Sequence, residues 1–448
     1  MRSATSLIVW LSPCILVLSL FGTNFVDCQK DKDTYASVGK FKRTKKVMGY
    51  YPVYNSEIQS PKQVDYSLYT DLLFFVAVPE TNHTFSYGGL LTPKRAEELA
   101  VEFVHLAKKN SVNPLISYGG WDGSRYFSQL SSTAARRTAF AKSMVQYAKK
   151  LGSRRVTFFM LLSGSPNVMG SQGKSNDARN FCRSSAGIGC NSYSPQDIVN
   201  FGLLIKEIRR IWPQGQLTAA IGLSGLVGSD GKPASSSETS EITRNLDFVN
   251  LMAYDVFGSW ANTTGPLAPI HNTCAPDPFK QSIESGFEVM IKQGFKAKQV
   301  ILGLPAYAIR VQLVSPKLTP TTVNGDTTFI YQNNTGVTPP GGISDDKPGK
   351  DVCGKEQLWG GSFLTTELIS KGWLSKDQKT GLNGYKRHFD ECSGTPFLTN
   401  GKYFITYEDQ KTSVTKAKWA QAHHLAGVFF FDTTGPTKST VSAVARVL

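Results

Sequence analysis

Short apolar runs alternate with segments of helical periodicity along most of this sequence, and the alternation restricts the folds open to it. The helical segments carry apolar residues three and four positions apart, as in the stripe of Ala96, Leu99 and Phe103. Continuous apolar runs are typical of strands that are buried on both faces of a parallel sheet. We predict strands at 47–52, 72–78, 114–120, 156–162, 217–221, 248–254, 300–304 and 427–432, and helices at 93–110, 133–151, 194–211, 279–293 and 415–424.

Eight strands that alternate with helices predict an α/β fold, a (β/α)8 TIM barrel. The chain has 448 residues, which is enough for one such barrel with an insertion. The segment at about 310–411, between the seventh and eighth strands, is too long for a single crossover and contains Trp359 and Trp373 among turn signals. We therefore expect a small inserted α+β subdomain there, beside the mouth of a barrel that spans 47–448.

The N-terminus has the pattern of a secretory signal. Arg2 supplies a positive charge, and the apolar stretch from Leu7 to Phe21 is too short to span a bilayer comfortably. We predict a signal peptide over 1–28, a secreted, extracellular protein, and a flexible basic arm over 29–46. The alternative is an uncleaved anchor. No later apolar run is long enough to span a membrane.

The net charge of +15 comes from Lys and Arg residues that are scattered along the chain. The strongest basic cluster runs from Lys40 to Lys46 and is most simply a solvated arm. A basic helix with interleaved aromatic residues is missing, so we predict no nucleic-acid partner. We expect a monomer.

Secretion makes the cysteines candidates for disulfides. After Cys14 and Cys28, five remain, and an odd number leaves one unpaired. We predict Cys353–Cys392, which would staple the insertion, and Cys190–Cys274, with Cys182 unpaired. No Cys or His pair has the spacing of metal ligands, so we expect neither a metal nor a cofactor. Glycosylation acceptor patterns occur at Asn82, Asn262 and Asn333 and agree with secretion.

Five motifs at the predicted strand ends resemble those of glycoside hydrolase family 18, and in particular its fungal chitinases. They are Gly49-Tyr50-Tyr51-Pro52, Ser117-Tyr118-Gly119-Gly120-Trp121, Met252-Ala253-Tyr254-Asp255, Gly303-Leu304-Pro305-Ala306-Tyr307, and Gly427-Val428 to Asp432. One such motif would be weak, but five in order over about 47–440 are specific.

The resemblance implies substrate-assisted hydrolysis of β-1,4-linked N-acetylglucosamine chains. In that chemistry a Glu protonates the leaving oxygen, the substrate's own acetamide attacks the anomeric carbon, and an Asp orients the acetamide. The family carries these groups on the fourth strand as Asp-x-x-Asp-x-Asp-x-Glu. An ungapped alignment places Arg154, Thr157 and Phe159 at the three Asp positions and Leu161 at the Glu position.

The sequence therefore lacks the general acid, and hydrolysis by the family mechanism should be lost while sugar binding persists. Residues implied to stack on sugars or to hydrogen-bond acetamides are Tyr51, Trp121, Tyr254, Asp255, Trp260 and Tyr307. Phe431 falls near the position where many family members place a Trp beneath the sugar, and it would keep some stacking. For Trp121, Tyr254 and Asp255 the alternatives are packing, a core position and a cap of the next loop.

Two explanations of the missing acid remain open. In one the loss is real, and the protein is a catalytically impaired binder of chitin or chitooligosaccharides. In the other, residues 154–186, which are rich in Ser, Asn and Gly, come from a frame or splice artefact, and the true product is an active endochitinase. A third hypothesis is an interaction protein without a carbohydrate ligand on the same barrel.

Overall fold

Eight parallel strands form a closed barrel, as the apolar runs predict. The computed structural model describes residues 45–87, 91–159, 190–276, 279–323 and 325–448. The barrel strands follow one another as β1-β18-β8-β7-β6-β5-β4-β2, and β1 also pairs with β2, which closes the ring. They are β1 (Lys46–Pro52), β2 (Asp71–Pro79), β4 (Asn113–Gly119), β5 (Arg155–Phe159), β6 (Gln216–Gly222), β7 (Phe248–Met252), β8 (Val300–Pro305) and β18 (Gly427–Phe431).

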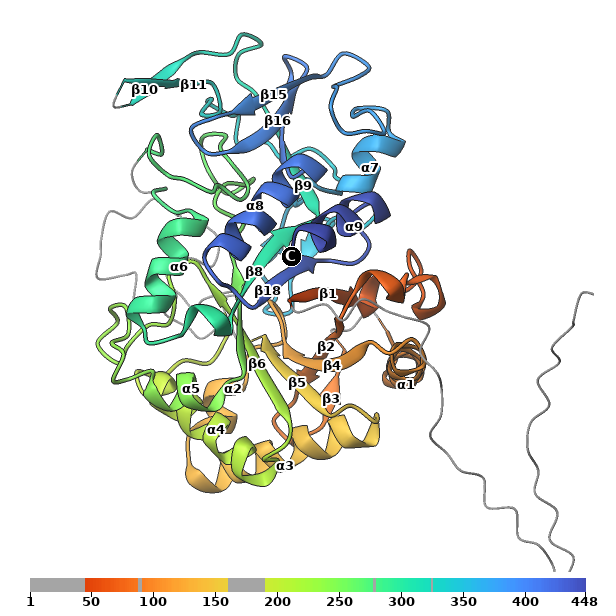
Figure 1. Ribbon diagram of the computed structural model, residues 1–448, viewed down its shortest axis with the longest axis vertical. Helices are drawn as coiled ribbons and strands as arrows, with labels where there is room; N and C mark the ends of the chain where they lie inside the picture. The colour runs from red at the N-terminus through yellow and green to blue at the C-terminus, as the bar shows by residue number, and fades with distance from the viewer. Residues whose placement is uncertain (1–44, 88–90, 160–189, 277–278, 324) are drawn as a thin grey trace, which may run out of the picture. The chain divides into compact units, whose positions relative to one another are not determined.

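Helices cover the outside of the barrel (Figure 1). They are α1 (Pro93–Lys109), α2 (Phe127–Ser131), α3 (Ala134–Lys150), α4 (Asp197–Ile211), α5 (Ser240–Asn245), α6 (Ile283–Lys292), α8 (Gln410–Ala422) and α9 (Lys438–Val447). Short 3-10 turns occur at η1 (Val53–Asn55), η2 (Pro61–Gln63), η3 (Tyr66–Leu68) and η5 (Ala297–Gln299). Within the described residues, no helix combines the length and the apolar character needed to cross a membrane.

Three predicted helix starts are wrong by three residues or more, because α6 begins at Ile283 instead of 279, α8 at Gln410 instead of 415, and α4 at Asp197 instead of 194. The Ser-Pro pair at Ser194 indicated a helix from 194, but α4 begins at Asp197. The backbone N–H of Ser194 instead donates to the Asp197 carboxylate at 2.9 Å, and this bond closes a turn ahead of the helix. The carboxylate thus satisfies a backbone donor that would otherwise lack a partner.

The predicted insertion is a five-stranded antiparallel sheet with one helix, placed in the chain between β8 and α8 (Figure 1). Its order is β14-β9-β17-β16-β15. The elements are β9 (Tyr307–Gln312), β14 (Ser362–Leu364), α7 (Thr365–Ser370), β15 (Lys386–Asp390), β16 (Thr395–Thr399) and β17 (Tyr403–Tyr407). Four short strands pair as two hairpins, β10 (Thr321–Val323) with β11 (Asp326–Thr328) and β12 (Gly349–Lys350) with β13 (Glu356–Gln357), and β3 (Phe85–Ser86) pairs with β2.

The predicted disulfide pairing is wrong, although the four cysteines are the ones expected. Cys190 is bonded to Cys353 and Cys274 to Cys392, with Cα–Cα distances of 5.6 and 6.0 Å. The prediction joined cysteines within the barrel and within the insertion. The fold instead brings the insertion against the loops after β5 and β7, so each bridge joins a barrel loop to the insertion. Cys182 lies outside the described residues.

The apolar core of the barrel has two layers on opposite sides of its strands. The larger layer fills the space between strands and helices and includes Phe74, Phe103 and Phe158. The smaller one fills the barrel interior and includes Met48, Tyr50 and Phe429. Because side chains alternate along a strand, neighbouring residues of one strand belong to different layers. This alternation decides which predicted site residues can reach the barrel mouth.

Candidate functional site

A cavity of about 670 Å³ opens at the carboxyl ends of the barrel strands, where active sites of such barrels lie. Its walls come from residues that follow the barrel strands and from the insertion. Among the predicted site residues, the lining includes Trp121, Tyr254, Asp255, Trp260, Tyr307 and Phe431. Six of the seven side chains expected to contact sugar therefore border one space.

Tyr51 is the exception, and its prediction is wrong. Its ring is fully buried beneath α1, stacked 5.1 Å from Phe103, and its hydroxyl donates to the Gln59 carbonyl at 3.1 Å. Tyr50, the preceding residue, points into the barrel instead, and its hydroxyl accepts from Asn250 Nδ2 at 2.8 Å. The two tyrosines occupy opposite faces of β1, as strand geometry requires.

Aromatic rings form the floor of the cavity. The ring of Phe431 lies 5.5 Å from Phe75, 5.4 Å from Tyr50 and 6.1 Å from Tyr254 between centroids. Tyr254 is buried, and its hydroxyl has no hydrogen-bond partner within the described residues. A ligand that bonds to this hydroxyl would therefore not have to displace a hydrogen bond from a described residue.

Asp255 is held by Tyr307, which comes from the next strand end. The Tyr307 hydroxyl donates to Asp255 Oδ1. Asp255 has a φ of 61°, in the left-handed region that non-glycine residues rarely adopt. Burial raises its pKa to about 6, against the lowering effect of the Tyr307 bond. A residue held in this conformation by a neighbouring side chain is typical of functional sites.

Three further carboxylates line the cavity and were not predicted as site residues. Asp432 lies directly after β18, and burial raises its pKa to about 6, offset in part by hydrogen bonds from Thr434. Asp122 and Asp346 are exposed at the rim. Asp432 is the last residue of the fifth strand-end motif and Asp122 directly follows the second, so the motifs could have indicated both. Asp346 lies in a loop of the insertion, where no pattern in the sequence marks it.

Comparison with known proteins agrees with this geometry. Residues 46–435 match the glycosyl hydrolases family 18. The chain belongs to this family. A chitinase-like effector of Moniliophthora roreri is 30% identical over 393 residues, covering 86% of this chain and 88% of that protein. A chitinase from Rhizomucor miehei shares the fold with a TM-score of 0.72 at 19% identity, covering 90% of this chain and 100% of its own. A mutant class V chitinase from Nicotiana tobaccum, in complex with NAG4, has a TM-score of 0.67 at 18% identity, over 90% of this chain and 98% of its own.

In this family 18 barrel, the described part of the fourth barrel strand, β5, carries no carboxylate. Thr157 is fully buried, and its hydroxyl lies 2.5 Å from the Thr218 hydroxyl of β6. Its neighbours Val156 and Phe158 pack in the outer layer, so Thr157 faces the barrel interior. Arg154 precedes the strand and is exposed, away from the cavity.

Phe159 and Leu161, the other two positions of the predicted motif, give less information about the missing acid. Phe159 ends β5, and its backbone pairs with Gly119 of β4. Leu161, aligned with the general acid, lies outside the described residues. On the strands beside β5 and on β7, two buried polar atoms have no hydrogen-bond partner within the described chain, Ser117 Oγ and Asn250 Oδ1. Of the two, only the Ser117 hydroxyl could donate to a carboxylate, because the Asn250 oxygen is itself an acceptor.

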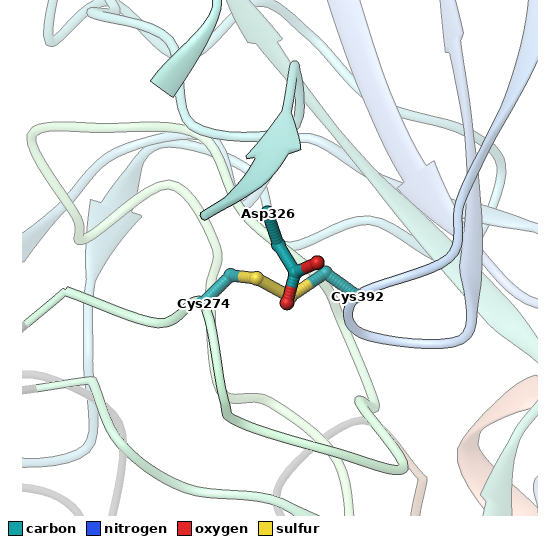
Figure 2. A group of neighbouring side chains, drawn as sticks. All are labelled: Cys274, Asp326 and Cys392. Atoms are coloured by element: carbon teal, nitrogen blue, oxygen red, sulfur yellow. A yellow bond between two sulfur atoms is a disulfide. The ribbon is translucent and has the colours of Figure 1, made fainter. Parts of the chain in front are cut away.

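One group of possible metal ligands occurs away from the cavity, at Cys274, Asp326 and Cys392 (Figure 2). The figure shows the two sulfurs joined to each other with the Asp326 carboxylate beside them. Metal ligation requires thiolates, and a disulfide offers none. The group therefore serves as a covalent link between a family 18 barrel loop and the insertion.

The three glycosylation acceptors are exposed. Asn82, Asn262 and Asn333 all present accessible side chains, so their positions are compatible with the predicted modification. Asn262 and Asn333 lie on adjacent segments, because Thr263 and Asn333 form an isolated antiparallel bridge.

Proposed function

We propose that this protein binds β-1,4-linked N-acetylglucosamine oligomers in the barrel-mouth cavity and does not hydrolyse them by the acetamide-assisted route. The observation that carries the proposal is Thr157, a hydroxyl bonded to Thr218 where the family pattern has a carboxylate. The cavity at the barrel mouth is otherwise lined by groups that suit a sugar.

The lining suits an oligosaccharide. Trp121, Trp260 and Phe431 offer ring faces against which the apolar faces of sugar rings can pack. Asp255 and the Tyr254 hydroxyl offer hydrogen-bonding groups at the floor. Relatives named chitinase and chitinase-like effector, and a solved chitinase in complex with NAG4, support the same ligand class.

Loss of turnover follows from the missing proton donor. Departure of a sugar oxygen needs a proton from a positioned acid, and general acid–base catalysis typically contributes about 10²–10⁴-fold. None of Thr157, Phe159 and Leu161 can supply this proton or charge-stabilise the attacking acetamide. The ligand would then remain intact in the cavity.

Binding and turnover are tested together. Isothermal titration of the full chain with the N-acetylglucosamine tetramer should show saturable binding, while chromatography of the same mixture shows uncleaved tetramer. Trp121→Ala should weaken binding about tenfold, because loss of one stacked ring removes about 1–2 kcal/mol. Lys292→Ala, a change on the exposed face of α6, is the control and should leave binding unchanged. Cleavage of the tetramer would favour the hypothesis of an active endochitinase. Absence of tetramer binding would favour an interaction protein whose partner is not a carbohydrate.

Mass-spectrometric peptide mapping of the secreted protein across 152–190 distinguishes the hypothesis of an impaired binder from that of an active endochitinase. Peptides that contain Val156-Thr157-Phe158-Phe159 support the binder. Peptides that carry an acidic motif at this place would contradict it and identify an active chitinase as the true product.

We also infer that the protein is extracellular. Two disulfides and exposed glycosylation acceptors are typical of the secretory route. N-terminal sequencing of the protein from culture medium should begin near residue 29. A chain that keeps residues 1–28 and stays with the cells would contradict this inference.

A further inference from the structure

The charge of the cavity is opposite to that of the protein. Asp122, Asp255, Asp346 and Asp432 line it, whereas its described lining contains no Lys, Arg or His. None of the four carboxylates takes part in an ion pair with a described residue. Arg125, which does not line the cavity, acts electrostatically on Asp122. A chain with a net charge of +15 thus presents an anionic hollow at its barrel mouth.

The carboxylates surround one space rather than facing separate surfaces. Asp122, Asp346 and Asp432 all act electrostatically on the Tyr54 hydroxyl. Asp255 and Asp432 both act on the hydroxyl of Tyr254. Asp432 is therefore common to both groups, at the floor, with Asp122 and Asp346 at the rim. Like charges that share a partly desolvated cavity repel one another, so a set of carboxylates of this kind favours a cationic ligand.

A second feature points independently to a ligand. Tyr254 is 8% exposed, and its hydroxyl has no hydrogen-bond partner within the described residues. Buried polar atoms are rarely left unpaired, because an unpaired one keeps the cost of losing its water. Tyr254 lines the cavity, and the charges of Asp255 and Asp432 both act on its hydroxyl.

The chemistry of the donors distinguishes two kinds of sugar unit. An N-acetylglucosamine unit brings one amide N–H and an acetyl carbonyl, and an ionised carboxylate repels that carbonyl. A glucosamine unit brings an ammonium group with three N–H donors and a positive charge, which ionised carboxylates accept. Acetamide-assisted catalysis would demand the acetyl group, but a cavity without the acid has no such requirement.

We infer that the cavity binds oligomers with at least one free amino sugar in preference to fully acetylated oligomers. This inference rests on the proposed function, because it assumes that the cavity holds β-1,4-linked glucosamine-type chains. The preferred ligand is then a partly or fully deacetylated oligomer of the chitosan class.

The test compares two tetramers of the same length on the full chain by isothermal titration, one fully acetylated and one fully deacetylated. We expect the deacetylated tetramer to bind at least about tenfold more tightly, which corresponds to about 1.4 kcal/mol. The preference should shrink as salt is raised from low to physiological concentration. Asp432→Asn and Asp346→Asn should each lower the ratio of the two affinities at least threefold, while the exposed Asp230→Asn, outside the cavity, should not.

The outcomes separate this inference from the function on which it rests. Equal or tighter binding of the acetylated tetramer overturns the inference and leaves the proposed function in place. Binding of neither tetramer overturns both. A loss of preference in Asp230→Asn as large as in Asp432→Asn also overturns the inference, because the effect would then come from general charge rather than from the cavity.

Discussion

Replacing Asp432 by Asn should stabilise the protein at alkaline pH but not at acidic pH. Asp432 is 8% exposed at the cavity floor, and its burial raises the pKa from 3.8 to about 6. The folded state therefore binds this proton more tightly than the unfolded state. The stability that protonation contributes is present at low pH and is lost as the pH rises through about 6.

The magnitude follows from the two pKa values. From about pH 4.5 to about pH 8, the linkage relation gives a loss of about 2 kcal/mol of unfolding free energy from Asp432 alone. Asn cannot ionise, yet its carbonyl oxygen can still accept the Thr434 N–H, which lies 2.8 Å from Asp432 Oδ1. Relative to the wild type, Asp432→Asn should therefore gain about 2 kcal/mol between the two pH values.

Urea unfolding followed by tryptophan fluorescence at both pH values measures this difference. Asp255 is unchanged in both proteins, so its own titration cancels. The control is Asp71→Asn, since Asp71 is a fully buried carboxylate paired with Lys46 at 2.9 Å. Its replacement should destabilise the protein at both pH values, because Lys46 then loses its partner. If Asp432→Asn shifts stability equally at both pH values, the reasoning from burial is refuted.

Two other variants test the missing acid and the buried charges. The triple variant Thr157→Asp, Phe159→Asp and Leu161→Glu should gain at least about a hundredfold in hydrolysis of a fluorogenic chitobioside, within the range of general acid catalysis; no gain in a folded, sugar-binding variant would refute the alignment of Leu161 with the acid. Lys416→Met should lower the free energy of unfolding by about 3–5 kcal/mol, measured by chemical denaturation, because it leaves Glu408 charged and unpaired in the interior; a loss below about 1 kcal/mol would show that water reaches Glu408.

The barrel could be predicted from the sequence because its strands are continuous apolar runs separated by amphipathic helices. That same continuity hides which side of a strand a residue faces. Tyr50 and Tyr51 are both fully buried, one inside the barrel and one under α1, so no polar–apolar alternation distinguished them. The wrong choice of Tyr51 for the site follows directly from this ambiguity.

Features that depend on how the insertion meets the barrel could not be predicted. Asp346 reaches the cavity from a loop of the insertion, at a position without periodicity or motif. The disulfide partners depend on the same contact. Bridges with sequence separations of 163 and 118 residues reflect the placement of the insertion, which local sequence does not record.

The two disulfides interlock along the chain, because Cys190 and Cys274 are followed by their partners Cys353 and Cys392 in the same order. Any single cut between Cys190 and Cys392 therefore leaves the two pieces tied by at least one bridge. A protease that nicks an exposed loop anywhere in this span would release no fragment, and the nicked protein would migrate as one band until a reductant is added. The disulfides would therefore keep the protein in one piece after a single cleavage by a protease in its surroundings.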